Sequence, residues 1–230
     1  MTSIAANLQA VRARIAAACV TAGRAADSVQ LLAVSKTWPA ASIREAVAAG
    51  QHAFGENYVQ EAVDKAVELK DLGLEWHFIG PLQGNKTRLV AENFAWVHSV
   101  DRLKIAERLA AQRPPALPPL QLCLQVNVSD EVSKSGCTPP QALDFAAAIG
   151  RLPGLRLRGL MAIPEPTEDV PRQRSQFALL RRTLEQINAE TDLALDTLSM
   201  GMSDDLEVAI MEGATMVRIG TAIFGERRPK

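Results

Sequence analysis

The chain alternates between short apolar runs and longer amphipathic segments along its whole length. Short apolar runs predict buried strands, and apolar residues spaced three and four positions apart predict helices. The predicted strands cover residues 30–36, 52–55, 75–79, 94–99, 120–128, 155–161, 195–199 and 215–219. The predicted helices cover residues 40–49, 57–70, 82–91, 101–112, 138–150, 168–189 and 204–212, with a leading helix at about 3–22.

The regular order of strands and helices indicates the fold class. Strands separated by helices pair in parallel through right-handed crossovers, and eight of them favour closure into a barrel. The run 120–128 is apolar nearly throughout, as expected of a strand covered on both faces. We therefore predict an α/β protein, a single (β/α)8 TIM barrel over residues 1–230, in which the leading helix covers the eighth strand. A doubly wound open sheet is the alternative.

Composition excludes several classes of protein. The chain is 47% hydrophobic and 22% charged with a net charge of -1, which is typical of a globular protein and gives no sign of a polyanion partner. Aromatic residues make up 4%, too few for a platform that stacks nucleic-acid bases. Apolar runs stay well below the roughly 20 residues of a membrane span, and the first residues lack a signal-peptide core. We expect a cytoplasmic protein that binds neither nucleic acid nor a membrane.

The three cysteines, Cys19, Cys123 and Cys137, share no metal-ligand spacing. Their odd number and wide separation indicate reduced thiols rather than a disulfide frame. Cys19 and Cys123 stand in apolar runs and are expected in the core. We predict no metal site.

Polar residues stand at the carboxyl ends of the predicted strands, where the loops of a barrel hold its chemistry. Lys36 ends the first apolar run and is followed by the breaker Trp38-Pro39. A partly desolvated lysine there is a candidate Schiff-base nucleophile, although the position also suits the first solvated residue of a loop. Other strand-end residues are Glu56, Asn57, His77, Gly80, Ser99, Asp101, Asn127, Met161, Ser199 and Arg218. We interpret Asp101 and Ser203 as N-caps of the helices that follow them.

The loops after the seventh and eighth strands read Ser199-Met-Gly-Met-Ser203 and Arg218-Ile-Gly-Thr221. Phosphate commonly binds these two loops in barrels, because glycine lets backbone amides approach an anion. Glycines also serve ordinary turns, so the loops alone are weak evidence. A phosphate cup on the same face as an amine nucleophile indicates a ligand that is both an aldehyde and a phosphate.

Pyridoxal 5'-phosphate is such a ligand, and a set of motifs points to one family of proteins that use it. The motifs are Ala33-Val-Ser-Lys-Thr37, Phe54-Gly-Glu-Asn-Tyr58, Trp76-His-Phe-Ile-Gly80, Val97-His-Ser99, Ser133-Lys-Ser-Gly136, Arg158-Gly-Leu-Met161, Leu198-Ser-Met-Gly-Met-Ser-Asp204 and Val217-Arg-Ile-Gly-Thr221. With these motifs in this order, the chain resembles the pyridoxal phosphate homeostasis protein family over essentially its whole length. The resemblance implies the barrel of the alanine racemase N-terminal domain and a fold type III cofactor site.

The resemblance also implies a role for each matching residue. Lys36 would bond pyridoxal 5'-phosphate as an internal aldimine, and Arg218 would lie beside the pyridine nitrogen. The implied phosphate contacts are Ser199, Gly220 and Thr221, with backbone amides near Met200 and Gly201. Asn57, His77, Asn127 and Met161 would line the remaining walls, although His77 also suits a hydrogen-bonded structural histidine.

The function implied by the resemblance is intracellular pyridoxal phosphate homeostasis, in which the protein holds the cofactor and delivers it to apoenzymes without robust catalytic activity. Arginine stays protonated, so Arg218 would leave the ring nitrogen unprotonated and the ring a poor electron sink. Two-base racemization needs an acid and a base on opposite faces, and the one tyrosine, Tyr58, is expected on the barrel rim. The alternatives are a weakly active enzyme of the amino-acid racemase type and a cofactor-free Schiff-base aldolase, against which Arg218 argues.

Two further positions bear on the implied function. Lys134 matches a family lysine considered for a second cofactor site, but a solvated loop lysine is the simpler interpretation. Many family members carry a lysine where this chain has Trp38, so any transfer step that needs that lysine is in doubt here. The missing racemase dimerization domain favours a monomer.

Overall fold

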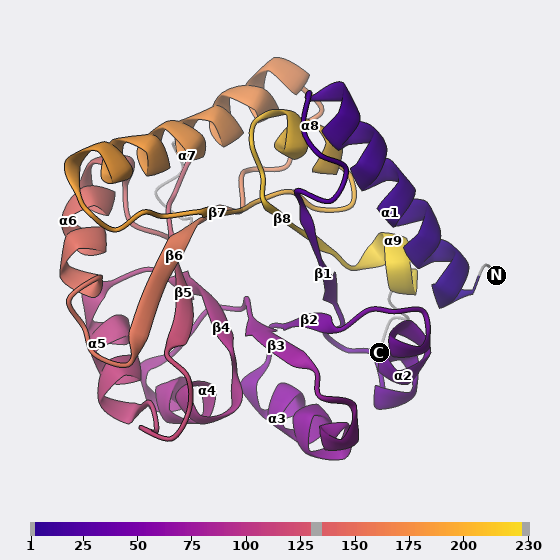
Figure 1. The fold of residues 1–230 in the computed structure, drawn as a ribbon, viewed down its shortest axis with the longest axis horizontal. Helices are drawn as coiled ribbons and strands as arrows, with labels where there is room; N and C mark the ends of the chain where they lie inside the picture. The colour runs from indigo at the N-terminus through magenta and orange to yellow at the C-terminus, as the bar shows by residue number, and fades with distance from the viewer. Residues whose placement is uncertain (1–2, 130–134, 227–230) are drawn as a thin grey trace.

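The computed structural model describes residues 3–129 and 135–226, and it shows a closed barrel of eight parallel strands in the order β1 to β8 (Figure 1). The strands are β1 (Gln30–Val34), β2 (Ala53–Glu56), β3 (Glu75–Phe78), β4 (Trp96–Val100), β5 (Leu120–Gln125), β6 (Leu155–Met161), β7 (Thr197–Ser199) and β8 (Met216–Ile219). The helices are α1 (Ile4–Thr21), α2 (Ala40–Ala48), α3 (Val59–Glu68), α4 (Thr87–Asn93), α5 (Leu103–Gln112), α6 (Pro139–Ile149), α7 (Val170–Glu190), α8 (Leu206–Met211) and α9 (Thr221–Phe224), with 3-10 turns η1 (Lys70–Leu72) and η2 (Gly84–Lys86). The predicted TIM barrel is confirmed, and the open sheet is excluded.

Differences from the predicted elements lie mainly at their ends. The helix predicted from residue 57 begins at Val59, because Asn57 forms a bend whose backbone lies against Gly80 and Tyr58 is still extended. A Cβ atom on Gly80 would overlap the backbone of Asn57, so only glycine fits there. The strand predicted to residue 128 leaves the sheet after Gln125, where Val126 forms an isolated bridge with Cys137.

The leading helix closes the outer ring, as predicted. Figure 1 shows α1 beside α8 and α9, and contacts with α2, α8 and α9 fix it there. Its buried residues Leu8, Val11, Ile15 and Cys19 follow the spacing of one helix face. Ser3 caps the helix, since its hydroxyl accepts a hydrogen bond from the Ala6 amide. The short helix α9 was not among the predicted elements.

The strands bury side chains on both faces. Their outward side chains join the helices in the main core, and inside the barrel lie two smaller apolar clusters: Leu32, Val34, Ala53, Ile79 and Met216, and Trp96, Cys123 and Met161. Polar side chains are buried as well, among them His77, His98, Ser199 and Arg218. All three cysteines are buried free thiols, and burial raises the pKa of Cys123 and of Cys137 to about 12.

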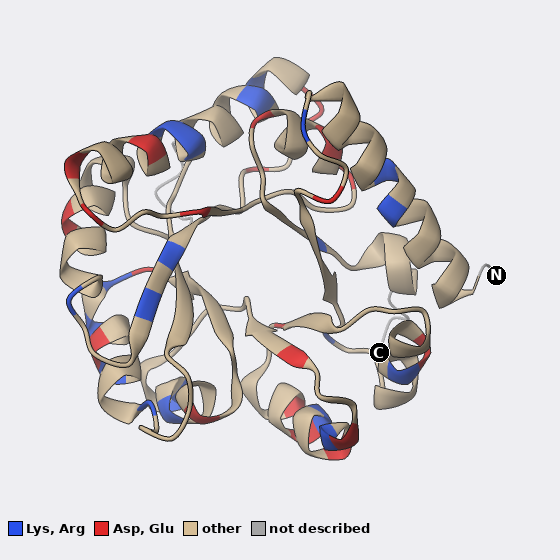
Figure 2. Cartoon of the chain, viewed as in Figure 1, with Lys and Arg blue, Asp and Glu red and all other residues tan. Residues whose placement is uncertain are grey.

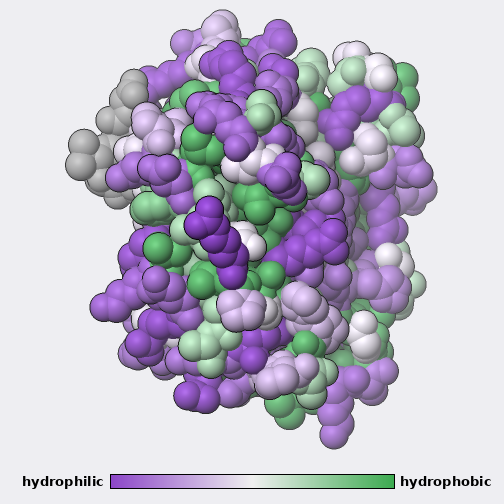
Figure 3. Space-filling view, turned by 60° about the vertical axis from the view of Figure 1, so that its left-hand side comes forward, coloured by the Kyte–Doolittle hydropathy of each residue, from purple (hydrophilic) through white to green (hydrophobic). Residues whose placement is uncertain are grey.

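Charged residues lie mostly on the surrounding helices and loops, with both signs interspersed (Figure 2). The face in Figure 3 shows apolar side chains in small patches among polar ones. Across residues 3–129 and 135–226, no helix is long and apolar enough to cross a bilayer.

Candidate functional site

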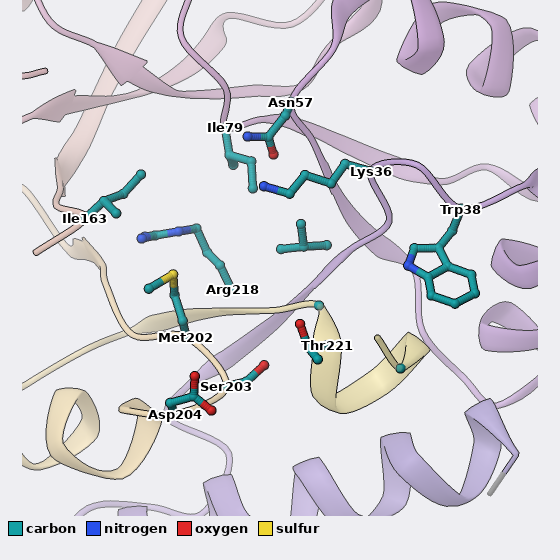
Figure 4. Close-up of a pocket in the computed structure, with 13 residues that line it drawn as sticks. Lys36, Trp38, Asn57, Ile79, Ile163, Met202, Ser203, Asp204, Arg218 and Thr221 are labelled. Carbon is teal, nitrogen blue, oxygen red and sulfur yellow. The ribbon is translucent and has the colours of Figure 1, made fainter. Parts of the chain in front are cut away.

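A cavity of about 200 Å³ opens at the carboxyl ends of the strands (Figure 4). Its walls are Val34, Lys36, Trp38, Asn57, Ile79, Ile163, Met202, Ser203, Asp204, Arg218, Gly220, Thr221 and Gly225. Five predicted site residues therefore meet here from β1, β2 and β8: Lys36, Asn57, Arg218, Gly220 and Thr221. The side chains of Lys36, Asn57 and Arg218 point into the same space, and Thr221 and Ser203 lie on its opposite side (Figure 4).

The backbone around Lys36 is fixed on both sides of the lysine. The Ser35 amide donates to the Gly55 carbonyl at 3.0 Å, which ties the end of β1 to β2. Thr37 has a φ of 69°, in the left-handed region that a β-branched residue rarely adopts. Its amide donates to Glu61 Oε1 at 2.6 Å. These bonds hold the chain in the conformation that directs Lys36 into the cavity.

Lys65 anchors this arrangement from below. Its side chain is buried on α3, and Nζ donates to the Ser35 carbonyl at 2.8 Å, to Glu56 Oε1 at 2.7 Å and to Glu61 Oε1 at 2.6 Å. Ser35 Oγ also donates to Glu56 Oε1 at 2.7 Å. We call Ser35, Glu56, Glu61 and Lys65 the lysine clamp. It binds both residues that flank Lys36 to β2 and α3.

Glu56 is fully buried at the centre of the lysine clamp. Burial raises the pKa of its carboxyl, while the Lys65 ammonium and the Ser35 hydroxyl act in the opposite direction. Its Oε2 atom has no hydrogen-bond partner among the described residues. A buried oxygen of this kind makes the clamp sensitive to the loss of Lys65.

Arg218 occupies the other side of the cavity. Its side chain is buried, with Nη1 donating to Ser199 Oγ at 2.7 Å and Nη2 to the Ala162 carbonyl at 2.8 Å. Desolvation lowers the pKa of the guanidinium to about 10, so it remains protonated at neutral pH. The structure therefore places a fixed positive charge in the cavity wall.

Hydroxyl groups and backbone amides gather at the opposite side of the cavity. Ser203 Oγ accepts a hydrogen bond from the Ala222 amide at 3.3 Å, which joins the loop after β7 to the start of α9. Asp205 Oδ1 accepts from the Met202 amide at 2.6 Å and holds the same loop. Gly220 precedes Thr221, and only hydrogen occupies the place of its side chain. This end can accommodate a small oxyanion.

Six predicted site residues do not line the cavity: Ser199, Met200, Gly201, His77, Met161 and Asn127. Ser199 ends β7 with its side chain inside the barrel, where its hydroxyl bonds Arg218 and His98. Met200 is fully buried. Gly201 has a φ of 96°, and a Cβ atom there would lie 2.7 Å from Ala209 Cβ, so the loop after β7 packs closely on α8 at this glycine.

His77 and Met161 also point into the barrel interior. His77 Nδ1 lies 2.9 Å from His98 Nε2, and His77 Nε2 lies 2.7 Å from Glu75 Oε1. Its ring stacks on Trp96 at 5.4 Å. A hydrogen-bonded structural histidine, one of the two interpretations of His77, fits this geometry. Met161 packs against Trp96 and Cys123.

Sequence reasoning missed some residues that shape the site. Ser203 is not a helix cap, because α8 begins at Leu206 with Asp205 in the cap position. Asp101 likewise pairs with Arg102, which is the cap residue of α5. Lys65 was overlooked, although Val59, Ala62 and Lys65 share the buried face of α3. A lysine at an apolar helix position was the available signal.

The remaining predicted features are placed as follows. Tyr58 is 54% exposed on the rim and does not line the cavity. Trp38 lines the cavity mouth and stacks on Phe224 with ring centroids 5.8 Å apart. Lys134 lies outside the described residues. Within residues 3–129 and 135–226, no cluster of His, Cys, Asp and Glu could hold a metal ion.

Comparison with known sequences places the chain among close relatives. Residues 4–228 match the family described as alanine racemase, N-terminal domain. A pyridoxal phosphate homeostasis protein from Pseudomonas aeruginosa is 63% identical over 227 residues, which cover 99% of this chain and 97% of that protein. The protein of the same name from Escherichia coli strain K12 is 56% identical over 232 residues, covering 99% and 98%.

Solved structures agree with the sequence comparison. PipY of Synechococcus elongatus, solved with PLP bound, is 40% identical and superposes with a TM-score of 0.85 over 97% of this chain and 100% of that one. Alanine racemase from Corynebacterium glutamicum, at 17% identity and a TM-score of 0.69 over 96% of this chain and 62% of that one, shares the fold. The chain therefore belongs to the alanine racemase N-terminal domain family and, within it, to the family of pyridoxal phosphate homeostasis proteins.

Proposed function

We propose that this chain binds pyridoxal 5'-phosphate in the cavity, attached through Lys36, and acts in pyridoxal phosphate homeostasis by holding the cofactor and passing it to apoenzymes. The observation that carries the proposal is the pairing of Lys36 with Arg218 across one small cavity whose far side presents hydroxyls and amides. The names of its relatives and the bound PLP in PipY support the same ligand.

The residues present fit this cofactor in their chemistry. Asn57 Oδ1 is buried and has no hydrogen-bond partner among the described residues, so it is ready to accept one from a ligand. Gly220, Thr221 and Ser203 suit the phosphate, and Asn57 and Ile79 would lie along the ring. Arg218 would donate to the pyridine nitrogen, because a guanidinium has only donors.

Bound in this way, the cofactor supplies an electrophilic aldehyde for the Lys36 amine and an electron sink of limited strength. Lys36 would hold the aldehyde, and the lysine clamp would keep the amine in position. Arg218 would keep its own proton and leave the ring nitrogen unprotonated. The apolar walls Val34, Ile79 and Ile163 would restrict water around the attachment.

The charged residues that line the cavity favour binding of the cofactor over catalytic turnover. Besides Lys36 and Arg218, the charged residue that lines the cavity is Asp204, beside Ser203 and apart from Lys36 in Figure 4. Racemization with two bases needs an acid and a base on opposite faces of the substrate. Tyr58 is exposed and does not reach the cavity. We therefore expect the protein to carry the cofactor rather than to catalyse robust amino-acid turnover.

The direct test is spectroscopic. The purified protein, incubated with pyridoxal 5'-phosphate and freed of excess, should show an absorption band that free cofactor lacks and that borohydride bleaches. Lys36→Ala should abolish the band, and mass spectrometry after reduction should find the cofactor on the peptide containing Lys36. Lys104→Ala, at an exposed position on α5, is the matched control and should keep the band. A wild-type protein that cannot be loaded would refute the proposal.

A second measurement separates the carrier from the enzyme. The loaded protein is mixed with a cofactor-free aminotransferase, and recovery of aminotransferase activity is followed against an equal amount of free cofactor. Loaded wild-type protein should restore activity, whereas protein reduced with borohydride should not. Incubation with an L-amino acid should yield neither the D-enantiomer nor a keto acid at a useful rate. Sustained turnover would favour the weakly active enzyme.

A further inference from the structure

A line of polar side chains crosses the barrel interior behind the cavity. His77 on β3, His98 on β4, Ser199 on β7 and Arg218 on β8 are all buried. The interior of such a barrel is ordinarily filled by branched apolar side chains, and a buried polar group is costly unless it is hydrogen-bonded. The proposed cofactor contacts use only Arg218. The other polar residues therefore need a separate explanation.

The hydrogen bonds form one continuous chain. Arg218 Nη1 donates to Ser199 Oγ at 2.7 Å, and Ser199 Oγ lies 2.8 Å from His98 Nδ1. His98 Nε2 lies 2.9 Å from His77 Nδ1, and His77 Nε2 lies 2.7 Å from Glu75 Oε1. We call Glu75, His77, His98 and Ser199 the histidine relay. Together with Arg218, the relay joins strands β3, β4, β7 and β8.

The ionised state of Glu75 gives the relay a single direction. Its hydrogen bond with His77 lowers the pKa of the carboxyl, so Glu75 accepts at neutral pH. Burial lowers the pKa of His77 and of His98, so each ring is neutral and has one donor and one acceptor. His77 must then carry its proton on Nε2, and so must His98. The reverse order would set a lone pair of His77 against the carboxylate.

The two ends of the relay lie in different surroundings. Glu75 begins β3 at the amino-terminal ends of the strands, and its side chain is 45% exposed beside an open groove lined by Trp96, Arg156 and Arg158. Arg218 is buried in the wall of the cavity at the carboxyl ends. Among the described residues, no carboxylate hydrogen-bonds its guanidinium. A buried cation needs compensating groups, and aligned hydrogen bonds polarise one another.

We propose that the histidine relay is the positioning device of Arg218: it fixes the guanidinium in the cavity wall and connects it to the carboxylate of Glu75 at the opposite face. Arg218 keeps its orientation because Ser199 Oγ accepts a hydrogen bond from Nη1, and the Ser199 hydroxyl is itself held by His98. A change at Glu75 is felt at Arg218 through the intervening bonds. The part of the proposal that concerns cofactor retention rests on the proposed function, whereas the relay itself does not.

The first test uses the protein without cofactor. Long-range ¹H–¹⁵N NMR of the imidazole rings at neutral pH should show His77 and His98 as Nε2-protonated neutral tautomers, with the exposed His52 as an internal reference. Glu75→Gln should shift the ring nitrogens of His98, two links away. Glu92→Gln, at an exposed carboxylate that lines the same groove, should leave them unchanged. An Nδ1-protonated ring, or a His98 signal indifferent to Glu75, would overturn the relay.

The second test measures its effect on the cofactor. Glu75→Gln should speed the dissociation of pyridoxal 5'-phosphate by about three- to tenfold, corresponding to about 1 kcal/mol, and Glu92→Gln should not. Ser199→Ala, which breaks the link next to Arg218, should have the larger effect. If wild-type protein does not bind the cofactor, the proposed function fails and the NMR experiment still decides the relay. If it binds and both relay variants release it at the wild-type rate, positioning of Arg218 is refuted.

Discussion

Lys36 and Arg218 are each held from behind by a buried polar network, and the two networks differ in where their charges lie. In the lysine clamp the charges of Lys65, Glu56 and Glu61 touch directly and hold the backbone on both sides of Lys36. In the histidine relay the charges stand at the ends, with neutral groups between them. A clamp of touching charges is local and rigid, whereas a relay spans the barrel.

The difference follows from what each residue must do. A nucleophile on a loop needs a fixed backbone, and the clamp supplies it by bonding a carbonyl and an amide that flank Lys36. Arg218 is a hydrogen-bond donor on a strand, so its backbone is already fixed and only its side chain needs to be held. Ser199 holds that side chain by accepting a hydrogen bond from the guanidinium. Substitutions in the two networks should therefore change the stability of the protein by different amounts.

The largest expected effect is the loss of the clamp's cation. Lys65→Met leaves Glu56 and Glu61 without their ion-pair partner, and removal of one partner from a buried ion pair costs about 3–5 kcal/mol of unfolding free energy. Urea unfolding of the cofactor-free protein measures it. Lys70→Met, at an exposed position just beyond α3, should change stability by less than about 0.5 kcal/mol.

A double variant separates charge from packing in the clamp. Adding Glu56→Leu to Lys65→Met removes the carboxylate that had lost its partner. The double variant should therefore lose less unfolding free energy than the two single variants lose together. Strict additivity would mean that Lys65 stabilises the fold by packing alone. The lysine clamp would then not depend on direct contact between charges, which is the feature that distinguishes it from the histidine relay.

The next largest expected effect comes from a substitution in the middle of the histidine relay. His98→Phe keeps a ring of similar size but orphans polar atoms of Ser199 and His77, each worth about 1–3 kcal/mol when buried. We expect a loss of about 2–3 kcal/mol, smaller than for Lys65→Met because no charge is stranded. His52→Phe is the exposed control. A loss larger than that of Lys65→Met would reverse the ranking of the two networks.

The two networks should contribute to the pH dependence of stability with opposite signs. The pKa values of His77 and His98 are lowered in the folded protein, so their contribution is present above about 6.5 and is lost as the pH falls below it. The loss should be on the order of 1 kcal/mol per pH unit for each histidine. The pKa of Glu56 is raised, so its contribution is present below about 4.5 and is lost as the pH rises through its folded pKa.

Urea unfolding between about pH 7.5 and pH 5.5 measures this balance. Stability should decrease as the pH is lowered through this range in the wild type, and it should decrease less in His98→Gln, because one of the two histidines with a lowered pKa has been removed. A stability that rises as the pH is lowered would show that the histidines are not held neutral.

Sequence reasoning reached the barrel and the residue that each network holds in place. The period of apolar residues predicts all eight strands, and the rule that chemistry collects at strand ends finds Lys36 and Arg218. It assigned the phosphate contact to Ser199 and a cap to Ser203, four residues apart in one loop. Which hydroxyl reaches the cavity depends on where the short strand β7 ends, and strand ends are the least certain part of a sequence prediction.

The partners of both residues were harder to foresee. Lys65 and His98 act through contacts with elements distant in the chain, and a single sequence does not show which polar residues meet inside a barrel. His77 was found by its strand-end position, but its bonds run to Glu75 and His98 inside the barrel. Polar residues at alternate positions of buried strands are therefore as informative as those at strand ends.

The smallest expected effect comes from an ion pair outside both networks. Arg44 donates to Asp71 at 2.9 and 3.1 Å on the exposed surface between α2 and η1, with geometry as good as that of the clamp. The neighbouring Arg44 guanidinium lowers the pKa of Asp71, yet water screens the pair. Asp71→Asn should lower the urea midpoint less than any of the substitutions within the two networks, and the difference should vanish in about 1 M salt, where screening acts over about 3 Å. A loss that matched Lys65→Met and resisted salt would mean that contact geometry, rather than burial, sets the strength of the lysine clamp.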